Sequence, residues 1–474
     1  MQLTDLTITQ AHQGLEKKEF SALELCKTYL DKIKERDKEI FAFLTVNTEE
    51  ALSQAKKIDN LISAGKKLPI LAGIPTAVKD NILVEGVKCT AGSKILENYI
   101  APYDATAIKK LKGEGCLILG KTNLDEFGMG SSTENSAFGP TRNPHDLTRV
   151  PGGTSGGSAA AVAANECVCA LGSDTGGSIR QPASFCGVVG LRPTYGAVSR
   201  YGLIAFVSSL DQISPVAKTV EDARIIFETI KGKDCLDSNS VEKPTPVKKL
   251  KIRELKIGVP KEYFVKGIDP EVEKLIKKAV KKYEEIGVKI EEVSLPHTEY
   301  ALPAYYIINP SEASANLARY DGIKYGYSAK EAKDLMEIYL KSKGEGFGQE
   351  VRRRITLGTY SLSAGYYEAY YLRAQKVRTL VKNDFEKVFE KVDAIFTPVS
   401  PVLPFKIGER IEDPLSMYLV DVYTVPISLA GLPALSLPVG KAANLPVGLQ
   451  IIGKHFEESK ILEIGEIFEK TCQR

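Results

Sequence analysis

The sequence is poor in residues that bind transition metals, and its cysteines show no pairing pattern. Only 4 of its 474 residues are histidine, and no two of them stand four residues apart. Its 8 cysteines are scattered and form no C-x-x-C pair. These absences argue against a histidine metal cluster, a zinc site and a disulfide framework. We therefore expect no metal site in the chain and reduced cysteines in its core.

Long hydrophobic runs and an excess of one charge are also missing. No run of 18 apolar residues occurs, and residues 1–12 lack the basic and apolar regions of a signal peptide. The 63 basic and 60 acidic residues leave a formal net charge of +3. The small net charge of the chain therefore does not indicate nucleic-acid binding, and any RNA contact must be local or made by a partner. We expect a soluble, cytosolic protein.

Two glycine-rich loops with hydroxyl residues are the most unusual feature that the sequence contains. They read V-P-G-G-T-S-G-G-S and G-S-D-T-G-G-S-I-R-Q-P within residues 150–190, and they flank a small-residue helix and an apolar strand at 168–171. Glycine at this density indicates unusual backbone angles or close approach of the backbone to a ligand. The two loops are therefore the first candidates for a functional site.

The second loop has the features of an oxyanion site. Ser178 stands where the buried strand is expected to turn into a helix that begins near Ile179, and the amides of Thr175, Gly176 and Gly177 precede it. Backbone amides bunched at such a turn stabilise a developing oxyanion. A serine hydroxyl beside them is a candidate nucleophile for acyl transfer.

Together the loops resemble the amidase signature family, whose catalytic group is a Ser–cis-Ser–Lys triad. The resemblance implies that Ser178 is the nucleophile, that Thr154 bridges the proton relay after a cis Gly153–Thr154 peptide, and that Lys79 is the base. It also implies an α/β fold with a mixed central sheet covered by helices on both faces. Thr154 departs from the serine of the family, and the adjacent Ser155 stays open as the bridge.

Lys79 has to meet a physical condition before it can act as a base. It follows the apolar stretch 68–78, so it is expected to end a buried strand; a surface lysine at a strand end is the alternative. A free lysine has a pKa of about 10.4, so burial or a nearby cation must keep the amine neutral near pH 7. A neutral Lys79 could then take the proton of Ser178 through the bridging hydroxyl.

Further segments resemble, within this family, the glutaminase subunits of glutamyl-tRNA(Gln) amidotransferases. They are G-K-T-N-L-D-E-F-G-M-G-S-S at 120–132, Y-Y-I-I-N-P-S-E-A-S-A-N-L-A-R-Y-D-G from Tyr305, R-R-R-I-T-L-G-T from Arg352, and M-Y-L-V-D-V-Y-T-V-P from Met417. The resemblance implies a glutamine pocket in which Arg354 holds the α-carboxylate, Asp421 holds the ammonium group and Tyr305 lines the wall. Arg352 and Arg353 stay open as the carboxylate ligand, and a solvated helix face is the alternative for Arg354.

The same resemblance implies a heterotrimeric complex. The partners would be a kinase/transamidase subunit, which binds ATP and magnesium, together with a small belt subunit, and Glu-tRNA(Gln) would be bound through the complex. Whether Asp-tRNA(Asn) is also a substrate stays open. A free-standing amidase of the same fold is the alternative, and dependence of activity on co-purifying partners distinguishes the two.

Two other motif matches lack the structural context that their chemistry needs. Residues 115–122 fit the P-loop pattern G-x-x-x-x-G-K-[ST], but the four apolar residues inside it read as a strand. Residues 153–157 fit G-x-S-x-G, yet residues 149–152 cannot form the strand that must precede that motif. A nucleotide-binding protein is therefore the least favoured alternative, which ATP binding to the isolated chain would reveal.

The rest of the chain predicts one amidase-like domain with four parts. These are a helical arm (1–60) with a capping box at Ser21 and Glu24, a catalytic core (61–230), a polar linker (231–251), and a second half (252–474) that completes the sheet and the pocket. The clearest unit is a strand–helix–strand crossover over 255–295, which indicates parallel pairing. A long helix is expected over 366–391, and further strands at 394–397, 435–439 and 447–452.

Overall fold

The structure, a computed structural model, describes residues 2–243, 250–264 and 267–471. Its centre is an 11-stranded mixed sheet in the order β1-β3-β2-β4-β6-β5-β10-β11-β9-β7-β8. The strands are β1 (Phe43–Val46), β2 (Pro75–Lys79), β3 (Leu117–Thr122), β4 (Cys169–Asp174), β5 (Val189–Arg192), β6 (Gln212–Ala217), β7 (Lys256–Pro260), β8 (Lys289–Val293), β9 (Ala394–Pro398), β10 (Ala434–Ala442) and β11 (Leu445–Ile452).

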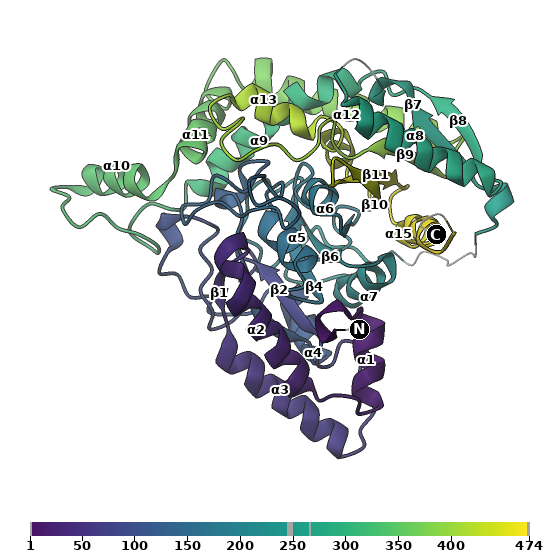
Figure 1. Ribbon diagram of the computed structural model, residues 1–474. Helices are drawn as coiled ribbons and strands as arrows, with labels where there is room; N and C mark the ends of the chain where they lie inside the picture. Colours follow the sequence, from purple (N-terminus) through teal and green to yellow (C-terminus); the bar gives the residue numbers. More distant parts are fainter. Residues whose placement is uncertain (1, 244–249, 265–266, 472–474) are drawn as a thin grey trace.

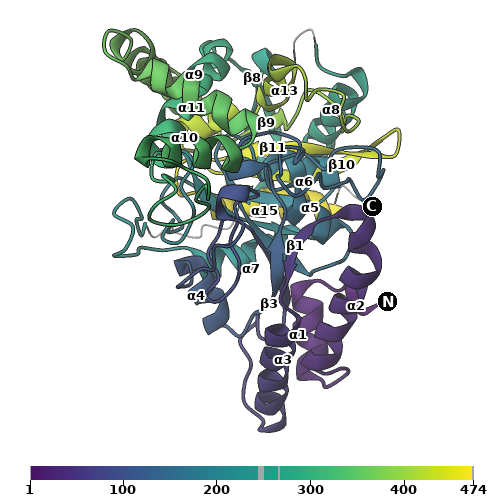
Figure 2. The same ribbon diagram turned by 90° about the vertical axis from the view of Figure 1, so that its left-hand side faces the viewer.

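Helices surround this sheet (Figure 1). They are α1 (Ile8–Glu16), α2 (Ala22–Ile40), α3 (Thr48–Ser63), α4 (Thr106–Gly113), α5 (Gly156–Ala163), α6 (Arg180–Cys186), α7 (Val220–Ile230), α8 (Pro270–Glu285), α9 (Ala301–Leu317), α10 (Leu335–Gly346), α11 (Gln349–Ser361), α12 (Arg373–Phe389), α13 (Pro414–Tyr418), α14 (Val425–Ala430) and α15 (Glu458–Thr471). Figures 1 and 2 place α1, α2 and α3 together at one end, and α10 stands out from the body.

Both faces of the sheet are covered, because neighbouring residues of one strand belong to different hydrophobic clusters. In β9, Ile395 packs in a cluster with residues of α9, α12 and α14, whereas Phe396 packs with residues of α2, α5, α7, α8 and α15. Successive side chains of a strand point to opposite faces. The expected α/β fold with helices on both faces is therefore confirmed.

The two halves of the chain share this one sheet. Strand β5 from the first half pairs antiparallel with β10 from the second, with Leu191 opposite Leu435. The expected crossover is present as β7–α8–β8, whose strands pair in parallel. Asp269 caps α8 through its side chain, and Pro270 is its first residue. Composition and turn residues thus predicted this unit correctly.

Two expected elements differ in extent. The capping box at Ser21 and Glu24 and the apolar spacing after it predict a helix from about Ala22 to Arg36; the capping box is present, and helix α2 continues to Ile40. The long helix expected over 366–391 is divided into a π-helical turn (Glu368–Leu372) and α12. Residues 117–122 form the buried strand β3, so the P-loop match is wrong, as its apolar residues indicated.

The expected linker is packed at its start. Residues 231–243 form no helix or strand, but Asp234 accepts hydrogen bonds from the hydroxyls of Thr106 and Ser199, and Asp237 forms an ion pair with Arg200 at 3.0 Å. Residues 244–249 of that stretch lie outside the described residues. Within the described ranges, no helix is long and apolar enough to cross a membrane.

Candidate active site

The two glycine-rich loops meet at the ends of two neighbouring parallel strands. Strands β2 and β4 pair in parallel, with Thr76 opposite Cys169. Lys79 is the last residue of β2, and the second loop follows β4 and leads into α6. Because the carboxyl ends of parallel strands lie at the same edge of a sheet, Lys79 and the second loop come close together.

Lys79 is fully buried among hydroxyl groups. Its Nζ donates to Thr154 Oγ1 at 2.6 Å, to Ser155 Oγ at 2.9 Å and to Ser173 Oγ at 3.0 Å, and the residue is 0% exposed. The surface-lysine alternative is therefore wrong. Burial lowers the pKa of Lys79 from 10.5 to about 7, although nearby aspartates act in the opposite direction. A lysine with this pKa is largely neutral just above pH 7, as a general base requires.

The hydroxyls of Thr154 and Ser155 both touch Lys79, but they differ in where their protons can go. Ser155 Oγ donates its proton to the carbonyl of Ser173, a residue of strand β4, at 3.0 Å. This proton is therefore already used in a hydrogen bond. Thr154 follows a cis peptide bond at Gly153–Thr154, as the resemblance implied. Among the described residues, Thr154 Oγ1 has no polar partner besides Lys79 Nζ. This difference favours Thr154 as the bridge of the relay.

Ser178 lies beside this group and is 8% exposed. Its carbonyl accepts a hydrogen bond from the amide of Ser155 at 3.0 Å, which joins the two loops. In the described ranges, its hydroxyl forms no hydrogen bond, so the link between Thr154 and Ser178 that a relay needs is not made in this structure. The Ser178 hydroxyl is left to an incoming group.

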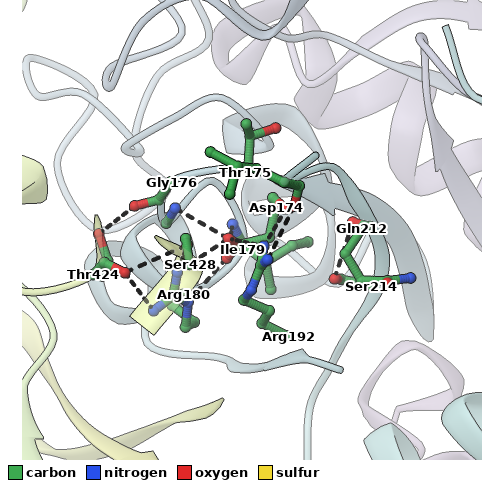
Figure 3. A network of polar contacts seen from close by, with 12 residues as sticks. Asp174, Thr175, Gly176, Ile179, Arg180, Arg192, Gln212, Ser214, Thr424 and Ser428 are labelled. Atoms are coloured by element: carbon green, nitrogen blue, oxygen red, sulfur yellow. Dashed lines mark hydrogen bonds and ion pairs between the residues drawn. The ribbon is translucent and has the colours of Figure 1, made fainter. Parts of the chain in front are cut away.

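The loop before Ser178 is held by a buried carboxylate, Asp174 (Figure 3). Asp174 accepts from the amides of Gly177 at 3.0 Å and Ile179 at 3.2 Å, and it pairs with Arg180 and Arg192. Burial alone would raise the pKa of Asp174, but the two guanidinium groups hold this pKa well below its usual range. The carboxylate therefore stays ionised and holds the loop through its hydrogen bonds to the two backbone amides.

The hydrogen bonds of Asp174 determine which backbone amides are left for the expected oxyanion site. The amide of Gly177 already donates to Asp174, whereas in the described part of the chain the amides of Thr175 and Gly176 have no acceptor. The carbonyl of Gly176 accepts from Thr424 Oγ1 at 2.6 Å (Figure 3). Thr175 and Gly176 are thus the better placed donors for an oxyanion, and Gly177 acts first as an anchor of the loop.

Arg354 is the buried arginine of the three in its stretch. It is 2% exposed, whereas Arg352 is exposed and Arg353 is half-buried. Its Nε donates to Glu350 Oε1 at 2.7 Å, and its guanidinium lies 5.4 Å from the ring centre of Tyr306. The solvated-face alternative is therefore wrong for Arg354. A buried guanidinium that stacks on aromatic rings is suited to hold a carboxylate.

Tyr305 and Asp421 connect this arginine to the second loop. A Cβ atom placed on Gly176 would lie only 2.5 Å from the hydroxyl of Tyr305, so Tyr305 packs directly on that loop. Asp421 is 8% exposed and accepts from Ser131 Oγ. Burial raises the pKa of Asp421 to about 7, against the effects of Ser131 and Arg354. A bound cation would stabilise the ionised carboxylate.

Several residues that build the site were not assigned a role from the sequence. Asp174 and Arg180 stand within the second glycine motif, where two opposite charges in an otherwise uncharged stretch could have indicated a buried pair. Gln181 accepts from the amide of Gly153 at 2.8 Å and donates to the carbonyl of Ser131 at 3.1 Å. Thr424 stands in the quoted segment that begins at Met417, but no role was assigned to it, and Arg192 lies outside every quoted motif.

The chain matches the family model described as "Amidase" over residues 24–462. It is 58% identical over 475 aligned positions to the A subunit of the glutamyl-tRNA(Gln) amidotransferase of Caldanaerobacter subterraneus subsp. tengcongensis, covering 99% of this chain and 97% of the relative.

Solved structures agree with this match. The crystal structure of the A subunit of the glutamyl-tRNA(Gln) amidotransferase from Thermotoga maritima is similar with a TM-score of 0.83 and 46% identity, over 99% of this chain and 95% of that one. The native peptide amidase from Stenotrophomonas maltophilia is similar with a TM-score of 0.81 and 27% identity, over 98% of this chain and 97% of that one.

Proposed function

The chain belongs to the amidase family, and we propose that it is the glutamine-hydrolysing subunit of a glutamyl-tRNA(Gln) amidotransferase. One observation carries the proposal: the buried Lys79–Thr154 pair lies beside the loop of Ser178, and Tyr305, which packs on Gly176 of that loop, is close enough to the buried Arg354 and Asp421 for both charges to act on its hydroxyl. Glutamine carries a carboxylate and an ammonium group at the end opposite its amide. A relative of this name shares 58% identity with the chain over nearly its full length.

In the reaction that we propose, Lys79 acts as the base. Its neutral amine takes the proton of Thr154 Oγ1, Thr154 takes the proton of Ser178 Oγ, and Ser178 attacks the amide carbon of glutamine. The amides of Thr175 and Gly176 stabilise the oxyanion, with Gly177 as the anchor of the loop. The proton returns through the relay to the leaving nitrogen, ammonia departs, and water then hydrolyses the acyl ester to glutamate.

The pocket supplies recognition of the substrate. Arg354 would hold the α-carboxylate, Asp421 the ammonium group, and Tyr305 the aliphatic chain between them. Thr424 supports this arrangement, because its hydroxyl lies 2.6 Å from the Gly176 carbonyl and 3.1 Å from the carbonyl of Asp421. The oxyanion loop and the ammonium site are thus joined through one side chain.

The relatives are themselves named as one subunit of an amidotransferase, which supports an assembly with other subunits. We propose that ammonia passes to a kinase/transamidase subunit, where ATP and magnesium activate Glu-tRNA(Gln), and that a small belt subunit completes a cytoplasmic heterotrimer. No cofactor is assigned to this chain.

A glutaminase assay with and without the two partner subunits tests the proposal. Glutamate release from glutamine that rises when the partners and Glu-tRNA(Gln) are added would support it. Full activity of the isolated chain on small amides, with no effect of the partners, would instead support a free-standing amidase.

A further inference from the structure

Asn309 is a buried polar residue next to Arg354 that the proposed reaction does not yet use. It lies on α9, one helical turn after Tyr305, and is 0% exposed. Arg354 Nη1 donates to Asn309 Oδ1 at 3.4 Å. Because a guanidinium can only donate, this contact sets the orientation of the amide, with its oxygen toward Arg354 and its nitrogen away.

The amide nitrogen of Asn309 is buried and makes no well-aligned hydrogen bond among the described residues, although the amide acts on the Tyr305 hydroxyl, whose pKa it lowers against the larger effect of burial. Buried donors of this kind are rare in folded proteins, because an unpaired donor is destabilising. In the same part of the chain, Arg354 Nη2 also has no acceptor, whereas Nε is paired with Glu350. Two neighbouring side chains thus each have a donor without a well-aligned acceptor.

Close packing of two helices fixes this pair. A Cβ atom on Gly358 of α11 would lie 1.9 Å from the carbonyl of Pro310 on α9, so the two helices approach closely there. Gly358 is one turn after Arg354, and Pro310 is the neighbour of Asn309. The separation and rotation of α9 and α11 therefore leave little freedom in how Asn309 faces Arg354.

We propose that Asn309 is a further substrate-specificity residue, whose Nδ2 donates to the α-carboxylate of glutamine beside Arg354. The inference rests on the proposed glutaminase function. A carboxylate has two oxygens and accepts several hydrogen bonds, so it can accept from one charged and one neutral donor on two neighbouring side chains. Tyr305, one turn earlier on α9, contacts Gly176 of the oxyanion loop. Asn309 thus lies one helical turn from Tyr305 and next to Arg354, where we place the end of glutamine opposite its amide.

The test compares Asn309→Leu with Asn309→Asp in the complex with the partner subunits. Leucine has as many non-hydrogen side-chain atoms as asparagine but neither donor nor acceptor, whereas aspartate keeps the acceptor for Arg354 but replaces the donor with a negative charge. The substrates are glutamine and 4-aminobutanamide, which is glutamine without its α-carboxylate. We expect the leucine variant to raise KM for glutamine about 10-fold or more at nearly unchanged kcat, and the aspartate variant to raise it further. Neither should change KM for 4-aminobutanamide.

A merely orienting role of Asn309 predicts the opposite order, because aspartate would hold Arg354 at least as well as asparagine does. A KM for glutamine in Asn309→Asp equal to or below that of Asn309→Leu would therefore overturn the inference. Equal losses on both substrates would overturn it too. If the leucine variant does not fold, as judged by thermal unfolding, Asn309→Ala takes its place in the comparison.

Asn316 on the same helix provides the matched control. Its Nδ2 donates to the carbonyl of Phe206 at 3.1 Å and to Ser208 Oγ at 2.9 Å, so its donors are paired within the protein. Asn316→Asp should leave the ratio of KM between the two substrates unchanged. A wild-type complex that releases no glutamate from glutamine would refute the proposed function itself, whereas active wild type with unaffected Asn309 variants would refute this inference alone.

Discussion

The charge of Lys79 depends on pH in the physiological range, because burial lowers its pKa to about 7. Below this pH the amine is protonated and cannot accept a proton; above it the amine is neutral. We therefore predict that kcat for glutamine hydrolysis rises with pH through an apparent pKa near 7 and then levels off. Lys79→Ala should lower kcat on the order of 10³-fold and abolish this dependence.

Asp421 also has a raised pKa of about 7 and could produce a similar profile. Its ionised form would bind the ammonium group, so it should act on KM of glutamine. Glutaramate, which is glutamine without the ammonium group, separates the two effects. A rise of kcat through pH 7 that persists with glutaramate belongs to Lys79; loss of the rise with this substrate would contradict the assignment.

Thr154 has a hydroxyl that contacts Lys79 at 2.6 Å, and the relay that we propose uses this hydroxyl and not the methyl group. Thr154→Ser should therefore change kcat little. Thr154→Val keeps the shape and deletes the hydroxyl, and it should lower kcat by about 10²-fold or more. Steady-state kinetics of these variants and of Ser155→Ala decide between the two bridges. An active Thr154→Val beside an inactive Ser155→Ala would transfer the role to Ser155.

Among single residues, those that stand inside recognisable motifs could be predicted from the sequence. Lys79 at the end of a strand and Ser178 at a turn followed from apolar and glycine patterns, whereas Thr154 and the three catalytic roles were implied by the family resemblance. The hydrogen bond from Gly177 to Asp174 could not be predicted, because it depends on loop geometry. The free donor of Asn309 likewise depends on how two distant helices meet.

The pair of helices α9 and α11 determines where Arg354 lies, and a glycine allows them to approach closely. A methyl group on Gly358 would lie 1.9 Å from the carbonyl of Pro310. We predict that Gly358→Ala displaces α11, lowers the unfolding temperature and raises KM for glutamine at least several-fold, because the displaced helix carries Arg354. Thermal unfolding and glutamine kinetics measure both effects.

Gly344 on α10 is the control for this change, since no atom lies within 4 Å of a Cβ placed there. Gly344→Ala should stabilise its helix by about 0.5–1 kcal/mol, since alanine restricts the unfolded chain more than glycine does. It should leave KM unchanged. Unchanged stability and KM in Gly358→Ala would contradict the role that we give to the contact between α9 and α11.

Helices with strong local capping signals could be predicted from the sequence. The residue at which a long helix is interrupted could not. The capping box of α2 and the Asp-Pro start of α8 are set by neighbouring residues, so they follow from the sequence alone. The π-helical turn before α12 has no such local cause in the sequence. Similarly, the polar composition of 231–243 predicted a loop but not the ion pair between Asp237 and Arg200.

Both halves of the chain contribute strands to the central sheet of the molecule. This shared sheet brings together the candidate site residues of the two halves. Lys79, Thr154 and Ser178 come from the first half, whereas Tyr305, Arg354 and Asp421 come from the second. The β5–β10 pairing joins these halves. The family resemblance implied the fold class, and local patterns predicted the β7–α8–β8 crossover, but the pairing of β5 with β10 is a long-range contact that no local pattern specifies.

The most direct measurement of the central claim uses Ser178→Ala in the assembled complex, with two nitrogen sources. The variant should form no Gln-tRNA(Gln) from glutamine, because its nucleophile is missing. With ammonium chloride in place of glutamine it should form Gln-tRNA(Gln) at nearly the wild-type rate, because the partner site needs only ammonia. Loss of both activities in a folded, assembled complex, or survival of the glutamine-dependent one, would contradict the account.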